Sequence, residues 1–461
     1  MTTSKPVGLL FPLLAMLFVD FVNAGDPKRS GLQIDRTLEA SFEDNDVEPA
    51  NPCESWVFQR RVTLDLAGRV PTVEELNRFK RIPVKEVLVD ELLASDEFNE
   101  YWSEIWTSIL VGRRVTEATD REALRQWIED AFRANVPFDQ VAFDLISAEG
   151  VSSLNGPVNF LVGNQEDPVT SVSRVFLGVQ LDCARCHDHP YDRWTQDDFE
   201  SMQRFFEPLD FREVSGGFQI EDEPGSSDDT PRFLTGARPK TMAWRRELAF
   251  MTVRSKPFAR AIGNRVWQIL FGVGLVDPVD GLSQNDRPSV PELHNAMANY
   301  LRESNFDLKG LVKEIALSNA YSRSSDPPEP MTAPALRMAR RLFAVRQPKL
   351  LLPEQLIRSY ASITNASPVS PTQRNETAVD WIGRSAVRVG SSDPISFTRT
   401  SQGLLNELAS RDRSVPENLD RLFEATLSRK PTTEERRGLS DENFQNLMYA
   451  LLHCNEFVFC R

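Results

Sequence analysis

The sequence contains little histidine and cysteine, with four His and five Cys among 461 residues. Metal and cofactor sites draw heavily on these two side chains, so such a site has few places in this chain where it can lie. Positive charge is also scarce, because 53 Lys and Arg face 67 Asp and Glu, which gives a formal net charge of −14. Sequence-independent binding to nucleic acid needs basic residues that displace counterions from phosphates. We therefore expect no nucleic-acid partner.

Several widespread catalytic motifs are missing too. The chain has no G-x-S-x-G, H-E-x-x-H, P-loop or Rossmann glycine pattern. Their absence argues against the standard hydrolases, NTPases and dehydrogenases, although it leaves open whether the protein is an enzyme. The composition, 41% hydrophobic and 26% charged, is that of a globular protein long enough to bury a full core.

One long apolar run stands near the N-terminus. Lys5 precedes an apolar stretch at 7–19, and Val22-Asn23-Ala24 offers small or apolar residues for cleavage. We expect residues 1–24 to be a secretory signal peptide, the alternative being an uncleaved anchor. No later stretch reaches 18 apolar residues without a charge, so we expect no membrane span after cleavage. The expected location is extracytoplasmic, either periplasmic or secreted, where disulfides can form.

Helical patterns dominate the rest of the chain. Apolar residues recur at three- and four-residue spacing, and strand patterns are hard to find. We expect a mainly α, multi-helix fold in which an acidic linker rich in Gly, Ser and Pro joins two helical domains. The expected division is a flexible leader at 25–52, an N-terminal domain at 53–212, the linker at 213–240 and a C-terminal domain at 241–461. A polar, irregular segment lies at 366–400.

A short segment of the chain recurs near its end. Residues 69–75 read Arg-Val-Pro-Thr-Val-Glu-Glu, and residues 429–435 read Arg-Lys-Pro-Thr-Thr-Glu-Glu. Both contain the Thr-x-x-Glu pattern of a helix capping box. A Leu-Leu pair and then a Phe follow each segment at nearly the same spacing (Leu92, Leu93 and Phe98; Leu451, Leu452 and Phe457). This pattern predicts one capped helical hairpin used twice, and the alternative is chance recurrence of a common box.

The motif that carries chemistry is Cys183-Ala184-Arg185-Cys186-His187. In an exported protein, C-x-x-C-H is the attachment signature of haem c. The thiols of Cys183 and Cys186 can form thioethers to the two haem vinyl groups, and His187 can then ligate the iron as the proximal ligand. The opposite axial position is either open or filled by one of five candidates (Met202, Met242, Met251, His294 and His453).

Two other interpretations of this motif remain open. Cys183 and Cys186 can close a local redox or structural disulfide. Alternatively, the two thiols together with His187 and His189 can hold a non-haem metal, since two sulfur and two nitrogen ligands suit Zn or another transition metal.

The three remaining cysteines are Cys53, Cys454 and Cys460. Three thiols allow at most one bridge among themselves. If Cys454 and Cys460 share a helix they are too far apart to pair, so a bridge would include Cys53 and would favour Cys460 as its partner. The alternative is that all three stay unpaired.

Residues 176–194, which read FLGVQLDCARCHDHPYDRW, resemble the hallmark of a planctomycete cytochrome-C-like domain of unknown function. Residues 60–72 are similar to the usual opening of that family. Segments at 258–280, 307–321 and 427–432 resemble its C-terminal partner domain. That family is named for its cytochrome-like motif, and the resemblance implies no established activity. The motif itself favours a c-type haem protein that carries electrons to a redox partner protein or senses a small ligand. A metal-dependent extracytoplasmic enzyme and a non-catalytic helical scaffold with a disulfide-closed loop are the alternatives.

Overall fold

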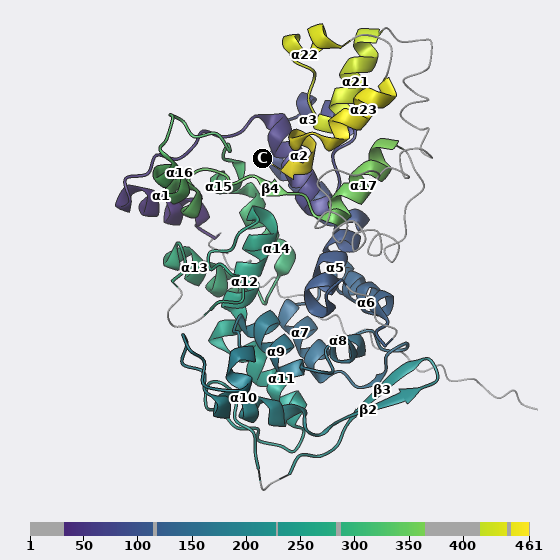
Figure 1. The fold of residues 1–461 in the computed structure, drawn as a ribbon, viewed down its shortest axis with the longest axis vertical. Coiled ribbons are helices and arrows are strands. Elements are labelled where there is room, and N and C mark those ends of the chain that lie inside the picture. The colour runs from purple at the N-terminus through teal and green to yellow at the C-terminus, as the bar shows by residue number, and fades with distance from the viewer. Residues whose placement is uncertain are drawn as a thin grey trace, which may run out of the picture. The chain divides into compact units, whose positions relative to one another are not determined.

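The computed structural model describes residues 32–113, 118–226, 229–282, 287–364, 415–439 and 444–460. Helices dominate these residues and the sheets are small, which confirms the mainly α fold (Figure 1). The predicted signal peptide lies outside the described residues, as does the polar segment at 366–400. Within the described ranges, no helix is both long enough and apolar enough to cross a membrane.

The described residues of the first half of the chain form ten α-helices and three short turns of other helix types. The α-helices are α1 (Ile34–Asp44), α2 (Ser55–Ala67), α3 (Val73–Arg81), α4 (Lys85–Ala94), α5 (Asp96–Val111), α6 (Arg121–Arg133), α7 (Phe138–Ser147), α8 (Val158–Gly163), α9 (Pro168–Val172) and α10 (Gln196–Gln203). The short turns are η1 (Ser173–Leu177), η2 (Asp182–Arg185) and η3 (Arg204–Phe206).

The prediction of a flexible leader at 25–52 is wrong for its described part, because α1 packs against the core. Ile34, Leu38 and Phe42 are buried and lie four residues apart, so they share one face of the helix. The Asp35 carboxylate accepts a hydrogen bond of 2.9 Å from the backbone N–H of Asn319. The apolar face is only three residues long among acidic neighbours, which is why the sequence pattern concealed it.

A β-hairpin occupies the start of the predicted linker. Strand β2 (Leu209–Val214) pairs antiparallel with β3 (Gly217–Asp222), and β1 (Gly150–Val151) pairs with the other edge of β3. Gly216 and Gly217 have φ values of 93° and 130°, which favour glycine. The glycines that we interpreted as part of a linker therefore form a tight hairpin turn, and this part of the linker prediction is wrong.

The second half of the chain supplies the remaining elements. They are α11 (Trp244–Arg254), α12 (Lys256–Phe271), α13 (Pro291–Glu303), α14 (Leu308–Leu317), α15 (Asn319–Ser322), α16 (Ala333–Arg341), β4 (Lys349–Leu350), α17 (Pro353–Thr364), α21 (Val415–Leu427), α22 (Thr433–Gly438), α23 (Phe444–His453), α24 (Asn455–Val458) and β5 (Phe459–Cys460). Strands β4 and β5 pair antiparallel.

Two hydrophobic cores lie among the described helices. The larger core takes side chains from both sides of the predicted linker, including Trp106 on α5 and Trp267 on α12. The smaller core combines Leu64 on α2 with Leu422 and Phe457 from the other end of the chain. The larger core takes side chains from both predicted domains, so it does not separate them. The division into two domains stays a prediction.

Both predicted capping boxes are confirmed. At the start of α3, the Thr72 hydroxyl accepts the Glu75 N–H at 3.2 Å, and the Glu75 carboxylate accepts the Thr72 N–H at 2.7 Å. Thr432 and Glu435 make the same two bonds at 3.2 and 2.7 Å at the start of α22. The same local pattern therefore produces the same helix start at two distant places.

An arginine beside each capping box ties the box to a later helix. Arg69 donates two hydrogen bonds to Glu75 and two to Glu97, at 2.6–2.9 Å, and a fifth to the Val70 carbonyl. The second arginine makes the same five bonds to the matching groups: Arg429 to Glu435, Glu456 and the Lys430 carbonyl. We call residues 55–98 the first copy and residues 415–457 the second copy.

Four joints between consecutive helices share one backbone geometry, with φ from −75° to −66° and ψ from 152° to 155° (Ser95, Ser255, Ser318 and Cys454). In the three serine joints the hydroxyl donates to the carbonyl three residues earlier and accepts the N–H three residues later. One serine thus ends one helix and begins the next. The residue three positions later is a buried aromatic side chain at every joint (Phe98, Phe258, Tyr321 and Phe457).

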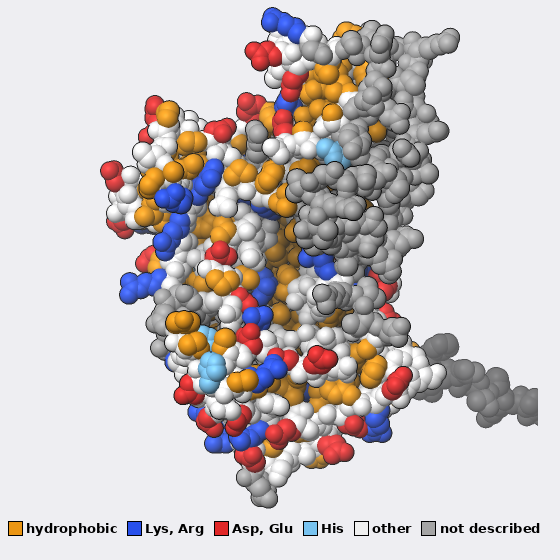
Figure 2. Space-filling model, in the orientation of Figure 1, with side chains coloured by type: hydrophobic (Ala, Val, Ile, Leu, Met, Phe, Trp, Pro, Cys, Tyr) orange, Lys and Arg blue, Asp and Glu red, His pale blue; other side chains and the backbone are white. Residues whose placement is uncertain are grey.

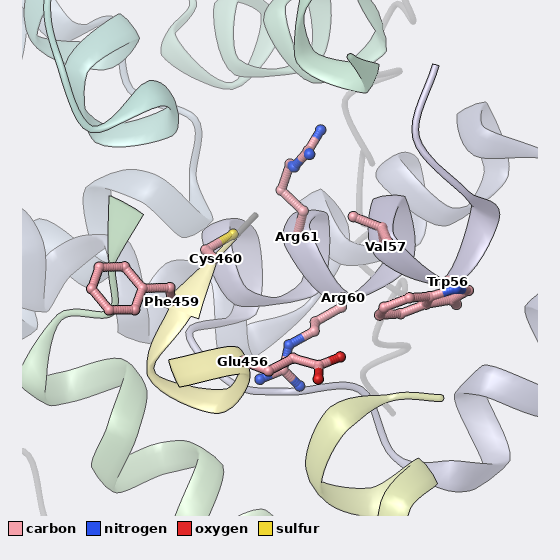
Figure 3. A pocket seen from close by; sticks show the side chains of 7 residues that line it. All are labelled: Trp56, Val57, Arg60, Arg61, Glu456, Phe459 and Cys460. Atoms are coloured by element: carbon pink, nitrogen blue, oxygen red, sulfur yellow. The ribbon is translucent and has the colours of Figure 1, made fainter. Parts of the chain in front are cut away.

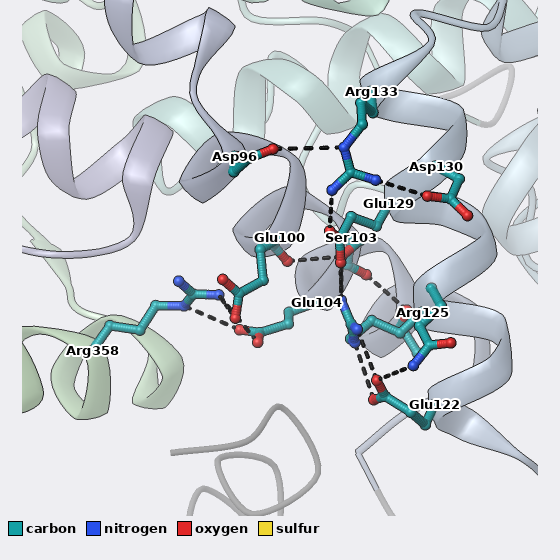
Figure 4. Close-up of polar contacts among 12 residues, drawn as sticks. Asp96, Glu100, Ser103, Glu104, Glu122, Arg125, Glu129, Asp130, Arg133 and Arg358 are labelled. Atoms are coloured by element: carbon teal, nitrogen blue, oxygen red, sulfur yellow. Dashed lines mark hydrogen bonds and ion pairs between the residues drawn. The ribbon is translucent and has the colours of Figure 1, made fainter. Parts of the chain in front are cut away.

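Ion pairs connect α5 to its neighbours on two sides (Figure 4). Arg358 on α17 lies 3.1 Å from both Glu100 and Glu104 on α5. Arg133 on α6 lies 3.5 Å from Asp96 on α5, and Arg125 on α6 donates a hydrogen bond of 3.4 Å to the Ser103 hydroxyl on α5. These charged groups satisfy one another, which fits a structural role in positioning α5.

Candidate functional site

The predicted cysteine motif lies on a surface loop whose base is buried. Cys183 belongs to the 3₁₀ turn η2 and Cys186 follows it directly. Residues three apart in such a turn share a face, and both thiols are exposed, as is His187. Ala184, between the two cysteines, is completely buried. The turn therefore points its reactive groups outward and anchors itself through an apolar residue.

Two ion pairs fix the start of this loop. Arg174 pairs with Asp182 at 3.2 Å, and Arg185 pairs with Asp167. The Arg185 guanidinium also lies over the ring of Phe199 on α10, 5.4 Å from its centroid. Asp167 also caps α9, because its carboxylate accepts the Thr170 N–H. Nothing in the sequence pattern indicated that its second oxygen would hold the motif.

The end of the loop is fixed by backbone contacts. The His189 N–H donates to the Trp194 carbonyl at 2.8 Å, and Trp194 is buried. The Gln196 N–H donates to the Asp188 carboxylate at 3.0 Å. Both ends of the exposed segment are therefore attached to ordered elements.

The two histidines of the loop differ in which ring nitrogen is engaged. His187 Nδ1 lies 2.8 Å from the Asp188 carbonyl oxygen. A carbonyl can only accept, so Nδ1 carries the proton and the neutral ring keeps its lone pair on Nε2. In contrast, His189 Nδ1 accepts the Tyr191 N–H at 3.2 Å, which places the proton of the neutral ring on Nε2. His187 thus presents a free ligand atom, whereas His189 does not in this conformation.

The described residues contain no group of three or more His, Cys, Asp or Glu side chains placed to hold a metal ion. All four members of the expected non-haem set, Cys183, Cys186, His187 and His189, are among those residues. The structure therefore does not assemble the four-ligand site that the sequence suggested as an alternative.

The five candidates for the opposite axial position lie in different environments. Met202 is fully buried on α10, a helix that packs against η2. Met242 is 47% exposed and Met251 is partly buried on α11. His294 is buried on α13, where its Nε2 lies 3.2 Å from the Arg260 carbonyl oxygen. His453 is exposed at the end of α23. Met202 therefore belongs to an element that packs against the cysteine turn η2.

The three remaining cysteines, Cys53, Cys454 and Cys460, form no bridge in the structure. All five cysteines of the chain are unpaired in the structure. Cys460 is buried in β5, beside a cavity of about 20 Å³ that Arg60 and Arg61 also line (Figure 3). Arg60 donates to the Phe457 carbonyl at 3.2 Å, and burial lowers the pKa of this guanidinium to about 10. Burial raises the pKa of the Cys460 thiol, and Asp65, Lys349, Arg61 and Arg346 act on it electrostatically.

Comparison with protein families agrees with the motifs. Residues 33–211 match a family model described as PSCyt2, a protein of unknown function (DUF1549). Residues 244–389 match another, PSD1, also described as a protein of unknown function (DUF1553). The two matched regions follow one another along the chain. No curated protein and no solved structure matches.

The DUF1549 region contains α1 and the complete cysteine loop, and the DUF1553 region begins at α11. The second copy of the capped hairpin, at 415–457, lies beyond both matched regions. The two matches support the resemblance that the sequence motifs carried, while the family descriptions assign no activity.

Proposed function

We propose that the protein is extracytoplasmic and carries haem c on the cysteine loop of its DUF1549 region, for electron transfer with a redox partner protein or for sensing a small ligand. Each thiol, of Cys183 and of Cys186, would add across one haem vinyl group, with sulfur bonding to one carbon and the hydrogen passing to the other. This addition needs no oxidant. His187 would ligate the iron through Nε2. The bound group would supply one-electron redox chemistry at iron.

The hydrogen bond between His187 Nδ1 and the Asp188 carbonyl carries this proposal. Metal-ligating histidines commonly donate their second ring nitrogen to a carbonyl or carboxylate, which fixes the tautomer and the ring orientation. His187 makes that contact at 2.8 Å. Exposure of both thiols adds support, since attachment requires that the porphyrin edge reach them. The donor set therefore fits covalent haem.

The chain's own residues would hold the group in place. Arg174 and Asp167 pair with residues on either side of Cys183 and so restrict the turn. Buried Ala184 and Trp194 fix the two ends of the segment between them. A rigid base under exposed ligands keeps the iron site in one geometry.

The test is expression with a haem c maturation system, followed by acid-acetone extraction and visible spectroscopy. We expect a Soret band that survives extraction. The double variant Cys183→Ala/Cys186→Ala should lose it, and His187→Ala should keep the thioethers but shift the spectrum. Cys454→Ser, which removes one thiol outside the motif, is the matched control and should leave the spectrum unchanged.

Three results would overturn the proposal. Loss of the band from the parent protein, together with stoichiometric Zn or Cu by elemental analysis, would favour a non-haem metal enzyme. Recovery of a Cys183–Cys186 disulfide peptide from protein without haem would favour a helical scaffold. Unchanged spectra in both motif variants would show that the motif does not hold the chromophore.

A further inference from the structure

A cleft of about 270 Å³ opens between α12 and α13, on the DUF1553 side of the chain. It is lined by Lys256, Arg260, Asn295, Ala298, Asn299 and Arg302. On α12 the lining residues are four apart, and on α13 they recur at three- and four-residue spacing, so each helix contributes one face. Figure 1 shows the two helices next to each other.

The three basic side chains of this cleft have no acidic partner in the part of the chain that the structure describes, and no carboxylate lines the cleft. On much of the face drawn in Figure 2, acidic and basic side chains lie near one another. The cleft, in contrast, gathers three cations although the chain has a net charge of −14. Like charges in one cleft repel one another, so the fold alone gains nothing from this arrangement.

Hydrogen bonds hold both guanidinium groups in place. Arg260 donates to the Asn295 side-chain oxygen at 2.7 Å, and Arg302 donates to the Lys256 carbonyl at 3.1 Å. A guanidinium has five N–H donors, so each arginine keeps donors for a ligand. Asn295 accepts through its oxygen, which leaves its NH₂ group as a further donor. The cleft thus presents fixed hydrogen-bond donors around an apolar floor at Ala298, which is buried.

We propose that this cleft binds a tetrahedral oxyanion, either free or as the phosphate or sulfate group of a small ester. Arginine suits such groups because its planar fork can donate two parallel bonds, and lysine adds a point charge. Pockets for drug-sized ligands measure roughly 300–1,000 Å³. The cleft lies just below that range, so it admits one anionic group with a small substituent.

Isothermal titration calorimetry on the full chain tests this proposal, with sodium phosphate, sodium sulfate and sodium acetate as separate probes at constant ionic strength. We expect saturable one-site binding of phosphate or sulfate, and the tighter of the two identifies the ester class. The variant Arg260→Gln/Arg302→Gln should weaken binding at least tenfold. Arg337→Gln makes the same change at an exposed site on α16 and should bind as tightly as the parent.

The variant Lys256→Gln tests anion binding without disturbing the fold. Lys256 is exposed, and its ammonium donates no hydrogen bond to another described residue, so its replacement leaves the helix contacts intact. Binding should weaken severalfold. Absence of saturable binding, equal binding of acetate, or equal weakening by Arg337→Gln would each overturn the proposal.

Discussion

In the two copies of the capped hairpin, Arg69 and Arg429 make matching hydrogen bonds, but the elements around the two copies differ. Helices α2 and α21 both have 13 residues, and each ends at a residue with left-handed backbone, Gly68 or Ser428. The helix after the joint differs, because α5 has 16 residues and α24 has four. The first copy therefore continues into the larger core, whereas the second copy ends within the smaller one.

The residue with positive φ after the first helix of each copy, Gly68 or Ser428, shows the effect of these different surroundings. A Cβ atom at Gly68 would lie 2.5 Å from the ring of Tyr101, which α5 packs against the turn. Glycine is required there for both conformation and space. Ser428 has φ of 63°, and its hydroxyl accepts a hydrogen bond from Arg60 at 3.1 Å. One local pattern thus accepts different residues according to which helix follows it.

Replacing the aromatic residue after each joint should have the largest effect. Phe98 and Phe457 are both completely buried. Phe98 stacks on Trp102 in the larger core, so we expect Phe98→Ala to lower the free energy of unfolding by about 3–5 kcal/mol. Phe457→Ala should lower the free energy of unfolding by less, because the smaller core can more readily collapse into the space that the ring leaves. Chemical denaturation measures both, and an equal or reversed order would break the comparison.

Removing the arginines should have the next largest effect. In the first copy burial would lower the pKa of Arg69, but its hydrogen bonds to Glu75 and Glu97 raise it overall. We expect Arg69→Met to destabilise the protein by about 2–3 kcal/mol, because it strands two partly buried carboxylates. Arg429→Met should destabilise it less, since Arg429 and its capping-box partner Glu435 are somewhat more exposed to water than Arg69 and Glu75. Thermal unfolding of the two variants measures this difference. Equal decreases in melting temperature would contradict the predicted order.

Acid titration should distinguish the two carboxylates of the capping boxes. Hydrogen bonds from Arg429 lower the pKa of Glu435 from 4.5 to about 2. For Glu75, burial acts to raise the pKa, and bonds from Arg69 lower it overall. Since both folded pKa values are depressed, the stabilisation is complete above 4.5 and is lost as pH falls through the folded value. Carboxyl NMR titration should give about 2 for Glu435, and Arg429→Met should return it towards 4.5.

Replacing the one cysteine joint should have the smallest effect. Cys454 takes the place that serine occupies in the other three joints, and its side chain caps no N–H. Cys454→Ser supplies the hydroxyl cap seen at Ser95, so we expect a change within about 0.5 kcal/mol, towards stability. Denaturation of this variant is the check, and a loss above 1 kcal/mol would show that the joints are not equivalent.

Much of the fold followed from local patterns in the sequence. Thr72 and Thr432 were identified as capping residues because the box depends only on residues three positions apart. The β2–β3 hairpin was missed because Gly216 and Gly217 serve equally well in a tight turn and in a linker. Helix α1 was missed because the helices that cover its apolar face, α13 and α15, are far away in the sequence.

The sequence predicted the residues of the candidate site, but it did not predict the contacts that hold the cysteine loop in place. Cys183, Cys186 and His187 stood out through their spacing, which is a local property. The pairing of Arg185 with Asp167 joins positions 18 residues apart and left no periodic signal. The cleft between α12 and α13 was missed for the same reason, because its basic residues are unremarkable on either helix alone.

The contacts of Arg60 have a consequence for the order of folding. Its guanidinium binds the Thr426 carbonyl, 366 residues later in the chain. The ribosome completes α2 long before α21, so Leu64 and Val70 lack their apolar partners on α21 until that helix has been made. The high sequence separation of these contacts predicts that the smaller core closes late in folding. A chain that stops before α21 would keep this apolar surface open to chaperones and proteases.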